Sequence, residues 1–134
     1  MKYLGTASLL FLFLACNAFE NENPELLAIQ GTWELERFNG GIGGWTTDMD
    51  TAGYTVSLKI SGTKGVWLVD DEVETKYNIS SATDNDNLLK FTSYERNTEQ
   101  INIPRYLRSI QENQIVIIDD CFDCFLYTFI RKKN

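Results

Sequence analysis

Short runs of alternating apolar and polar residues dominate the chain beyond its first 30 positions. In the clearest run, residues 54–61, Tyr54, Val56, Leu58 and Ile60 alternate with polar residues. A period of two is typical of a β-strand with one buried face. We therefore expect these four side chains to face a core.

Similar runs follow one another to the end of the chain, separated by turn residues. The predicted strands are residues 30–38, 54–61, 66–69, 73–79, 88–94, 106–110, 115–118 and 125–131. About eight short strands joined by hairpins predict an all-β fold, and favour an up-and-down antiparallel barrel over a sandwich. At most one short helical turn is expected, at 24–28, with Asn23 as its N-cap and Pro24 in its first position.

A glycine-rich segment interrupts the strand pattern after the first strand. Four of the five residues at 40–44 are glycine, and Trp45 follows them. We expect residues 40–53 to form a long flexible loop at one mouth of the barrel. Trp45 in this loop, and Trp67 on the third strand, either close over an apolar ligand or complete a small core. The sequence favours neither alternative.

The interior of an eight-stranded barrel is just wide enough to be filled by side chains or to hold one small ligand. Bulky residues at inward positions, among them Phe129, would occupy most of that space and leave a shallow cavity. The candidate ligand-binding residues are Trp45, Tyr54, Trp67, Tyr77, Phe91 and Tyr127.

The N-terminus has the pattern of a secretory signal peptide. Lys2 precedes a short apolar run within residues 1–15, which is too short to span a membrane and lacks the packing partners that a buried helix would need. The Ala15-Cys16 pair resembles a bacterial lipobox, which implies that Cys16 is acylated. We expect a tether with the short helical turn at 16–28 and one barrel domain at 29–134.

Composition and charge exclude several function classes. The chain has 134 residues, a formal charge of −7 and no histidine. The length suits a single domain. Without a basic stretch, nucleic acid is not expected as a partner. Without histidine, Ser-His-Asp and Cys-His catalysis and most transition-metal sites are excluded.

Two short motifs carry a family resemblance. Gly31-Thr32-Trp33 resembles the Gly-x-Trp signature of lipocalins and the wider calycin group, and residues 127–131 resemble their final strand. The chain is most similar to small lipocalin-like lipoproteins of the Bacteroidetes. This resemblance implies that Arg131 stacks on Trp33 and plugs one end of the barrel, where the guanidinium would cover the indole ring.

Two cysteines remain once Cys16 is set aside. Cys121 and Cys124 flank the predicted turn of the last hairpin. A local disulfide is favoured over a thioredoxin-type role, because no helix N-terminus adjoins the pair. It is also favoured over zinc, for which no further cysteine or histidine ligand exists.

Acidic residues cluster at 70–72 and at 119–123. They could bind Ca²⁺ or act as an acid/base pair, but adjacent acids on a strand point to opposite faces. We therefore interpret both clusters as solvated turns.

These observations favour a non-enzymatic lipoprotein of the bacterial cell envelope, anchored in the outer membrane and monomeric, without a metal or cofactor. It would bind a small apolar or amphipathic ligand at the barrel's open end, beneath residues 40–53. The alternative is a packed barrel that docks a protein partner as an envelope inhibitor or assembly factor. An enzyme is the least supported class, because only carboxylates, hydroxyls and two cysteines are available for chemistry.

Overall fold

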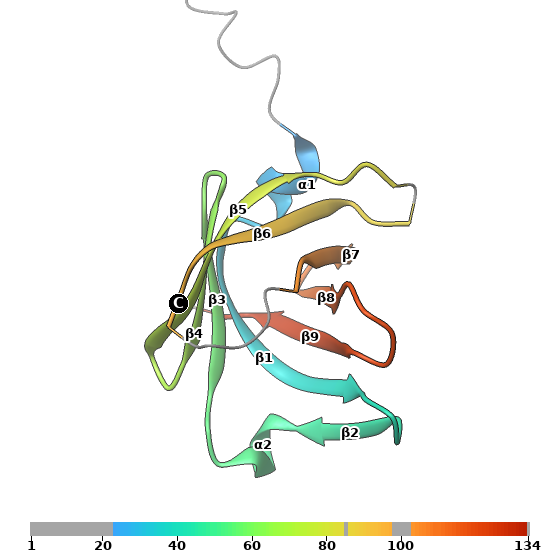
Figure 1. Ribbon diagram of the computed structural model, residues 1–134. Coiled ribbons are helices and arrows are strands. Elements are labelled where there is room, and N and C mark those ends of the chain that lie inside the picture. The colour runs from blue at the N-terminus through green and yellow to red at the C-terminus, as the bar shows by residue number, and fades with distance from the viewer. Residues whose placement is uncertain (1–22, 85, 98–102, 134) are drawn as a thin grey trace, which may run out of the picture.

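Nine β-strands and two short α-helices make up the part of the chain that the computed structural model describes, which is residues 23–84, 86–97 and 103–133 (Figure 1). In chain order they are α1 (Pro24–Ala28), β1 (Gly31–Gly40), β2 (Trp45–Asp48), α2 (Met49–Ala52), β3 (Val56–Ser61), β4 (Lys64–Val69), β5 (Glu72–Ser81), β6 (Leu89–Arg96), β7 (Arg105–Gln111), β8 (Gln114–Asp119) and β9 (Phe125–Arg131). No helix in these three ranges is long and apolar enough to cross a membrane.

Eight of these strands close into a barrel. β3 to β9 pair in chain order, and β1 pairs with β3 on one side and with β9 on the other. All the pairings are antiparallel. β2 lies outside this ring and pairs with the second half of β1. The predicted eight-stranded up-and-down barrel is therefore confirmed, with β2 as an extra strand.

Alternating burial and local bulges shape the barrel wall. Val56, Leu58 and Ile60 on β3 are buried, whereas Lys59 between them is exposed. Bulges bend a strand and increase its twist, which helps a short sheet to curl into a closed ring. The pairing shifts register between Leu35 and Arg37, Trp67 and Leu68, Lys76 and Tyr77, and Leu107 and Ser109.

Large side chains pack most of the barrel interior. Trp33, Phe91 and Phe129 are at most 1% exposed, and Trp67 and Tyr77 are also buried. The aliphatic part of the core consists of Ile29, Leu35, Val56, Leu58, Ile60, Ile79, Leu89, Leu107, Ile115 and Ile117. Space for a ligand must therefore be sought towards the ends of the barrel.

The two ends of the barrel differ. The end that carries α1 is called the closed end here. Asn23 caps α1 as predicted, because its Oδ1 accepts the N–H groups of Glu25 and Leu26 at 2.9 and 3.2 Å, and Pro24 occupies the first position. The opposite end carries β2, α2 and the hairpin that joins β8 to β9 (Figure 1), and is called the open end.

The expectation of a long flexible loop at 40–53 is wrong. β2 and α2 occupy most of this segment, so the fold also has a second short helix beyond the one expected. Gly40 allows the chain to turn here: its φ is +139°, and a Cβ at this position would collide with the Cys124 carbonyl oxygen. β1 and β9 can approach closely at this point only because residue 40 has no side chain.

The turn between β4 and β5 holds two aspartates in the left-handed backbone region. Asp70 and Asp71 have φ values of 50° and 64° and connect Val69 to Glu72, which face each other. The Oδ1 of Asp70 accepts the N–H of Thr55 at 2.9 Å. Asp71 has no such bond among the contacts of the described residues, so its side chain only restricts the backbone.

Replacing Asp71 with glycine is expected to raise the free energy of unfolding by up to about 1 kcal/mol, because glycine adopts a positive φ without steric cost. Urea denaturation would measure the change. Asp70→Gly is the matched control and should gain less, since it loses the bond to Thr55. A destabilised Asp71→Gly variant would contradict this description of the turn.

Candidate functional site

A buried ion pair lies inside the barrel near its open end. Arg105 begins β7 and Asp119 ends β8, and the two residues face each other across the sheet. The Arg105 Nε donates to the Asp119 Oδ1 at 2.8 Å, and the two side chains are 19% and 7% exposed. Buried charges of this kind are tolerated only when they are paired and hydrogen-bonded.

Aromatic rings surround this pair. The Arg105 guanidinium carbon lies 3.9 Å from the centre of the Trp67 ring and 5.1 Å from that of Tyr127. Its Nη1 donates to the Tyr77 hydroxyl at 2.6 Å. The Tyr127 hydroxyl in turn donates to the Asp119 Oδ2 at 3.2 Å. Stacking and hydrogen bonds together fix the guanidinium in one orientation.

The protonation states in this cluster follow from burial and charge. Burial raises the pKa of Tyr77, although Arg105 acts in the opposite direction. Burial also raises the pKa of Tyr127, and the neighbouring Asp119 adds to this shift while Arg105 opposes it. For Arg105, burial alone would lower the pKa, but Tyr77, Tyr127 and Asp119 more than offset it. Both phenols therefore hold their protons while the guanidinium stays charged.

These shifts predict a loss of stability in alkali. The unfolded chain releases its tyrosine protons near pH 10, whereas folded Tyr77 and Tyr127 retain theirs. The contribution of these two phenols to the free energy of unfolding is therefore complete below about pH 10 and declines as the pH rises beyond it. Urea denaturation at about pH 8 and about pH 10.5 should show the decline. Tyr127→Phe should reduce it, with the same substitution at exposed Tyr94 as the control.

A cleft of about 220 Å³ opens over the ion pair. Its charged groups are two arginines, Arg96 and Arg105, and two acids, Glu74 and Asp119. A guanidinium has five N–H donors, and those of Arg105 that do not bond to Asp119 or Tyr77 remain for other partners. The cleft can therefore hydrogen-bond to a polar group.

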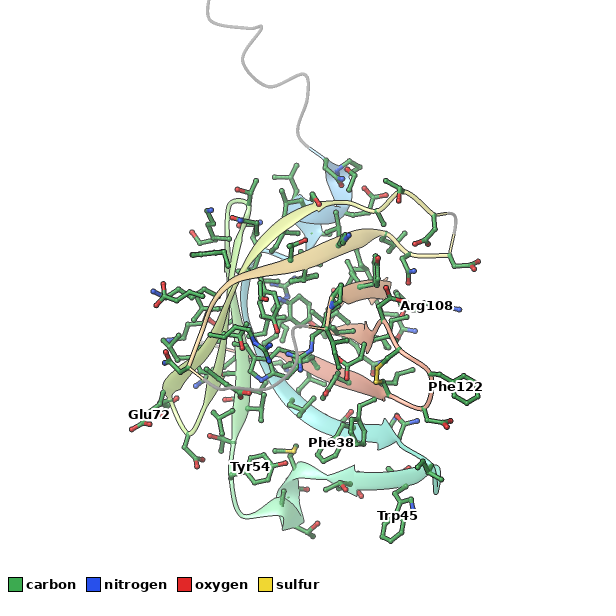
Figure 2. The ribbon with its side chains drawn as sticks, in the orientation of Figure 1. Phe38, Trp45, Tyr54, Glu72, Arg108 and Phe122 are labelled. Atoms are coloured by element: carbon green, nitrogen blue, oxygen red, sulfur yellow. A yellow bond between two sulfur atoms is a disulfide. The ribbon has the colours of Figure 1, made fainter. Side chains whose placement is uncertain are left out.

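An apolar groove of about 520 Å³ lies next to this cleft, on one face of the β1–β2 hairpin. Phe38 on β1 and Thr47 on β2 are register partners, and Trp45 pairs with Gly40. Because residues two apart share a face, Phe38, Trp45 and Thr47 all face the groove, as its lining confirms. Figure 2 shows this hairpin extending beyond the barrel wall, with Phe38 and Trp45 labelled.

A chain of aromatic contacts links the core to the groove. Trp67 lies 5.2 Å from Phe129 and 5.1 Å from Tyr127, measured between ring centres. Phe38 follows at 6.2 Å from Tyr127 and 5.6 Å from Phe125. Phe125 lines both the groove and the cleft, so the two hollows adjoin at this residue.

The structure brings together part of the predicted ligand-binding set. Trp67, Tyr77 and Tyr127 surround Arg105, and Phe91 lies deeper, 5.9 Å from Tyr77. Trp45 is 75% exposed at the edge of the groove. These positions place five of the six predicted aromatic residues at or below the open end.

Tyr54 does not belong with this set. It is 38% exposed and lines a separate hollow beside α2 and β3. The prediction that it faces inward is wrong, because β3 begins at Val56 and Tyr54 precedes it.

The two central charges of the site are not among the predicted site residues. The sequence pattern predicts a solvated turn for Asp119, but its side chain is only 7% exposed and is paired; Asp120 and Asp123 in the same cluster are exposed, as are Asp70 and Asp71. Arg105 was not singled out at all. Among the described residues, no group of three or more Cys, Asp or Glu side chains could hold a metal ion.

At the closed end, the predicted stacking is present. The Arg131 guanidinium carbon lies 4.2 Å from the centre of the Trp33 ring. Its Nη1 and Nη2 donate to the carbonyls of Gln30 and Ala28 at 2.7 and 2.8 Å. Gly31 has φ +113°, and a Cβ there would lie 3.3 Å from the Arg131 Nη1. The glycine therefore leaves room for the arginine.

The cysteine pair also lies where it was expected. Cys121 and Cys124 form a disulfide across the β8–β9 hairpin, with their Cα atoms 5.4 Å apart. Cys124 lines the cleft, so the crosslink holds one wall of the open end. Cys16 and the expected signal peptide at 1–15 lie outside the described residues.

Comparisons with protein-family models, curated proteins and solved structures found no match to this chain.

Proposed function

We propose that this protein is a non-enzymatic binding protein that takes a small amphipathic molecule at the open end of its barrel. The observation that carries this proposal is the pair of adjoining hollows that share Phe125. The groove offers aromatic rings to an apolar chain. The cleft offers arginine and carboxylate groups to a polar head.

The volumes agree with this division. Small-molecule sites usually measure about 300–1,000 Å³ and are lined mainly by apolar side chains with a few polar groups. The groove, at about 520 Å³, falls in this range, whereas the cleft, at about 220 Å³, has room only for a head group. The packed core beneath them leaves no room for the ligand deep in the lumen.

The proposed cellular setting is the outer membrane of a bacterial envelope, with the chain anchored as a lipoprotein through acylated Cys16. The described chain begins at the closed end, opposite the β1–β2 and β8–β9 hairpins (Figure 1), whose residues line the groove. A tether attached before α1 therefore leaves the binding end pointing away from its anchor. We propose a monomer that needs no cofactor.

Tryptophan fluorescence tests the proposal, because Trp45 borders the groove and Trp67 lies beneath the cleft. A medium-chain fatty acid and the matching alcohol should each quench the fluorescence saturably. The matching methyl ester should bind more weakly than either, because its head has neither a negative charge for Arg105 nor an O–H to donate to the carboxylates of the cleft. Absence of saturable quenching by all three probes would overturn the proposal.

Two variants separate the roles of the hollows. Phe125→Ala removes the shared wall and should weaken the binding of all three probes. Phe122→Ala, in the same hairpin but 95% exposed, is the matched control. The double variant Arg105→Met/Asp119→Leu removes both central charges and should abolish the preference for the acid and the alcohol over the ester. An unchanged preference would remove the cleft from the proposed site.

A further inference from the structure

Two adjacent turns at the open end expose large apolar side chains. Ile42 is 96% exposed, Phe122 95% and Trp45 75%. We call these three residues the apolar tips. The turns lie side by side, because Ile42 and Asp123 line the same groove. Figure 2 shows Trp45 and Phe122 projecting outward from the open end.

The fold holds both turns in place. The Phe125 ring lies within 3.7 Å of the position that a Cβ on Gly41 would occupy, and Gly40 packs against the Cys124 backbone. The disulfide closes the other turn. Single exposed apolar residues are common, but three of them on two adjoining, fixed turns form a surface that a partner can cover. Tryptophan is also among the residue types that dominate binding energy at interfaces.

The two chain segments that build these turns carry charges of one sign. Residues 38–58 and 109–130, which build both turns, contain no lysine or arginine. The same two segments carry four exposed aspartates: Asp48, Asp50, Asp120 and Asp123. A surface that complements this arrangement has an apolar pocket surrounded by lysine and arginine. An anionic lipid surface would instead be repelled.

We propose that the apolar tips dock a basic protein partner, with Phe122 and Ile42 inserted into an apolar pocket ringed by cationic side chains. This surface meets the proposed ligand site at Ile42 and Trp45, which line the groove, and extends beyond it at Phe122, which lines neither hollow. The two turns also lie at the end of the barrel opposite α1, where the described chain begins (Figure 1).

Site-specific photocrosslinking in the cells of origin tests the proposal. A photoreactive phenylalanine analogue would replace Phe122, and in a second variant Ile42. Exposed Tyr94, which lies on β6 away from both turns, is the control position. We expect one protein adduct at positions 122 and 42 and none at 94. The crosslinked peptide should lie beside lysine or arginine residues.

The purified partner from that adduct then gives the quantitative test. Phe122→Ser and Ile42→Ser should each weaken binding at least about tenfold, whereas Tyr94→Ser should not. The double variant Asp120→Asn/Asp123→Asn should slow association, and so should added salt. Glu72→Gln should not, because Glu72 lies on the opposite side of the barrel from Phe122 (Figure 2). Phe122→Ser should leave fatty-acid quenching unchanged, so a failure of docking is distinguishable from a failure of ligand binding.

Four outcomes would overturn the proposal. The first is the absence of an adduct at both tip positions, the second an adduct only with lipid, and the third an adduct only with a second copy of this chain. The fourth is an adduct with a protein whose purified form binds the Phe122→Ser variant as tightly as the wild type.

Discussion

Replacing Arg105 with methionine is expected to lower the free energy of unfolding by about 3–5 kcal/mol. Asp119 is 7% exposed and accepts the Arg105 Nε–H at 2.8 Å. Removal of the guanidinium therefore leaves a buried carboxylate without its cation. The Tyr77 hydroxyl and the Trp67 ring lose a partner at the same time. Urea denaturation of the wild type and the variant measures the difference.

Two control variants separate the effect of leaving a buried charge unpaired from the effect of losing an ion pair as such. Arg105→Met/Asp119→Leu replaces the pair with apolar side chains and should recover most of this loss, because it leaves no buried charge unpaired and only the Tyr77 and Tyr127 hydroxyls lose their partners. Lys132→Met breaks the exposed pair with Glu34, which spans 3.2 Å, and should cost less than about 1 kcal/mol. If Arg105→Met were as stable as the wild type, our description of the ion pair would be wrong.

A stable double variant would also bear on why the pair exists. If apolar residues stabilise the barrel equally well, stability does not account for an arginine and an aspartate at this position. Their position under an open cleft then favours a role in ligand binding, which the altered head-group preference of the same variant tests directly.

The barrel could be predicted from the sequence because the patterns that indicate it lie within short stretches of the chain. The period of two in residues 56–61 requires one buried face, and the turn residues between the strands place consecutive strands in hairpins. The stacking of Arg131 on Trp33 was also predicted, from the family resemblance. It joins residues 98 positions apart that are register partners of β1 and β9.

The segment at 40–53 could not be predicted, because its order comes from distant contacts. Its four glycines at 40–44 indicate flexibility. β2 nevertheless forms because the second half of β1 offers it a free edge, as the pairing of Gly40 with Trp45 and of Arg37 with Asp48 shows. Local sequence carries no information about that edge.

The buried ion pair was missed although a signal for it exists. Arg105 lies two residues before Leu107, and Asp119 lies two residues after Ile117; both apolar residues are at most 1% exposed. Residues two apart share a face of a strand, so counting from these core positions places both charges inside the barrel. Their polarity suggested solvent exposure instead, because charged residues are rarely buried unless they are paired.

Replacing Arg131 with methionine is expected to lower the free energy of unfolding by about 2–4 kcal/mol. The estimate combines the hydrogen bonds of a charged donor to the Gln30 and Ala28 carbonyls with the stacking on Trp33. Urea denaturation measures the loss. Arg108→Met is the matched control, because Arg108 is exposed on β7 (Figure 2), and it should change stability by less than about 0.5 kcal/mol.

The loss should be concentrated at the closed end. Arg131 fixes the segment between α1 and β1 through two carbonyls, and the Trp33 Nε1–H donates to a third, that of Ile29, at 2.8 Å. Without the arginine, the indole bond and the two bonds between the Gln30 side chain and the Gly62 backbone still tie this segment to the described wall, but its last contacts with β9 are lost. Amide hydrogen exchange at residues 25–30 should therefore accelerate more than exchange in β8. Equal acceleration in both would mean that Arg131 stabilises the barrel as a whole and does not specifically hold α1 over its end.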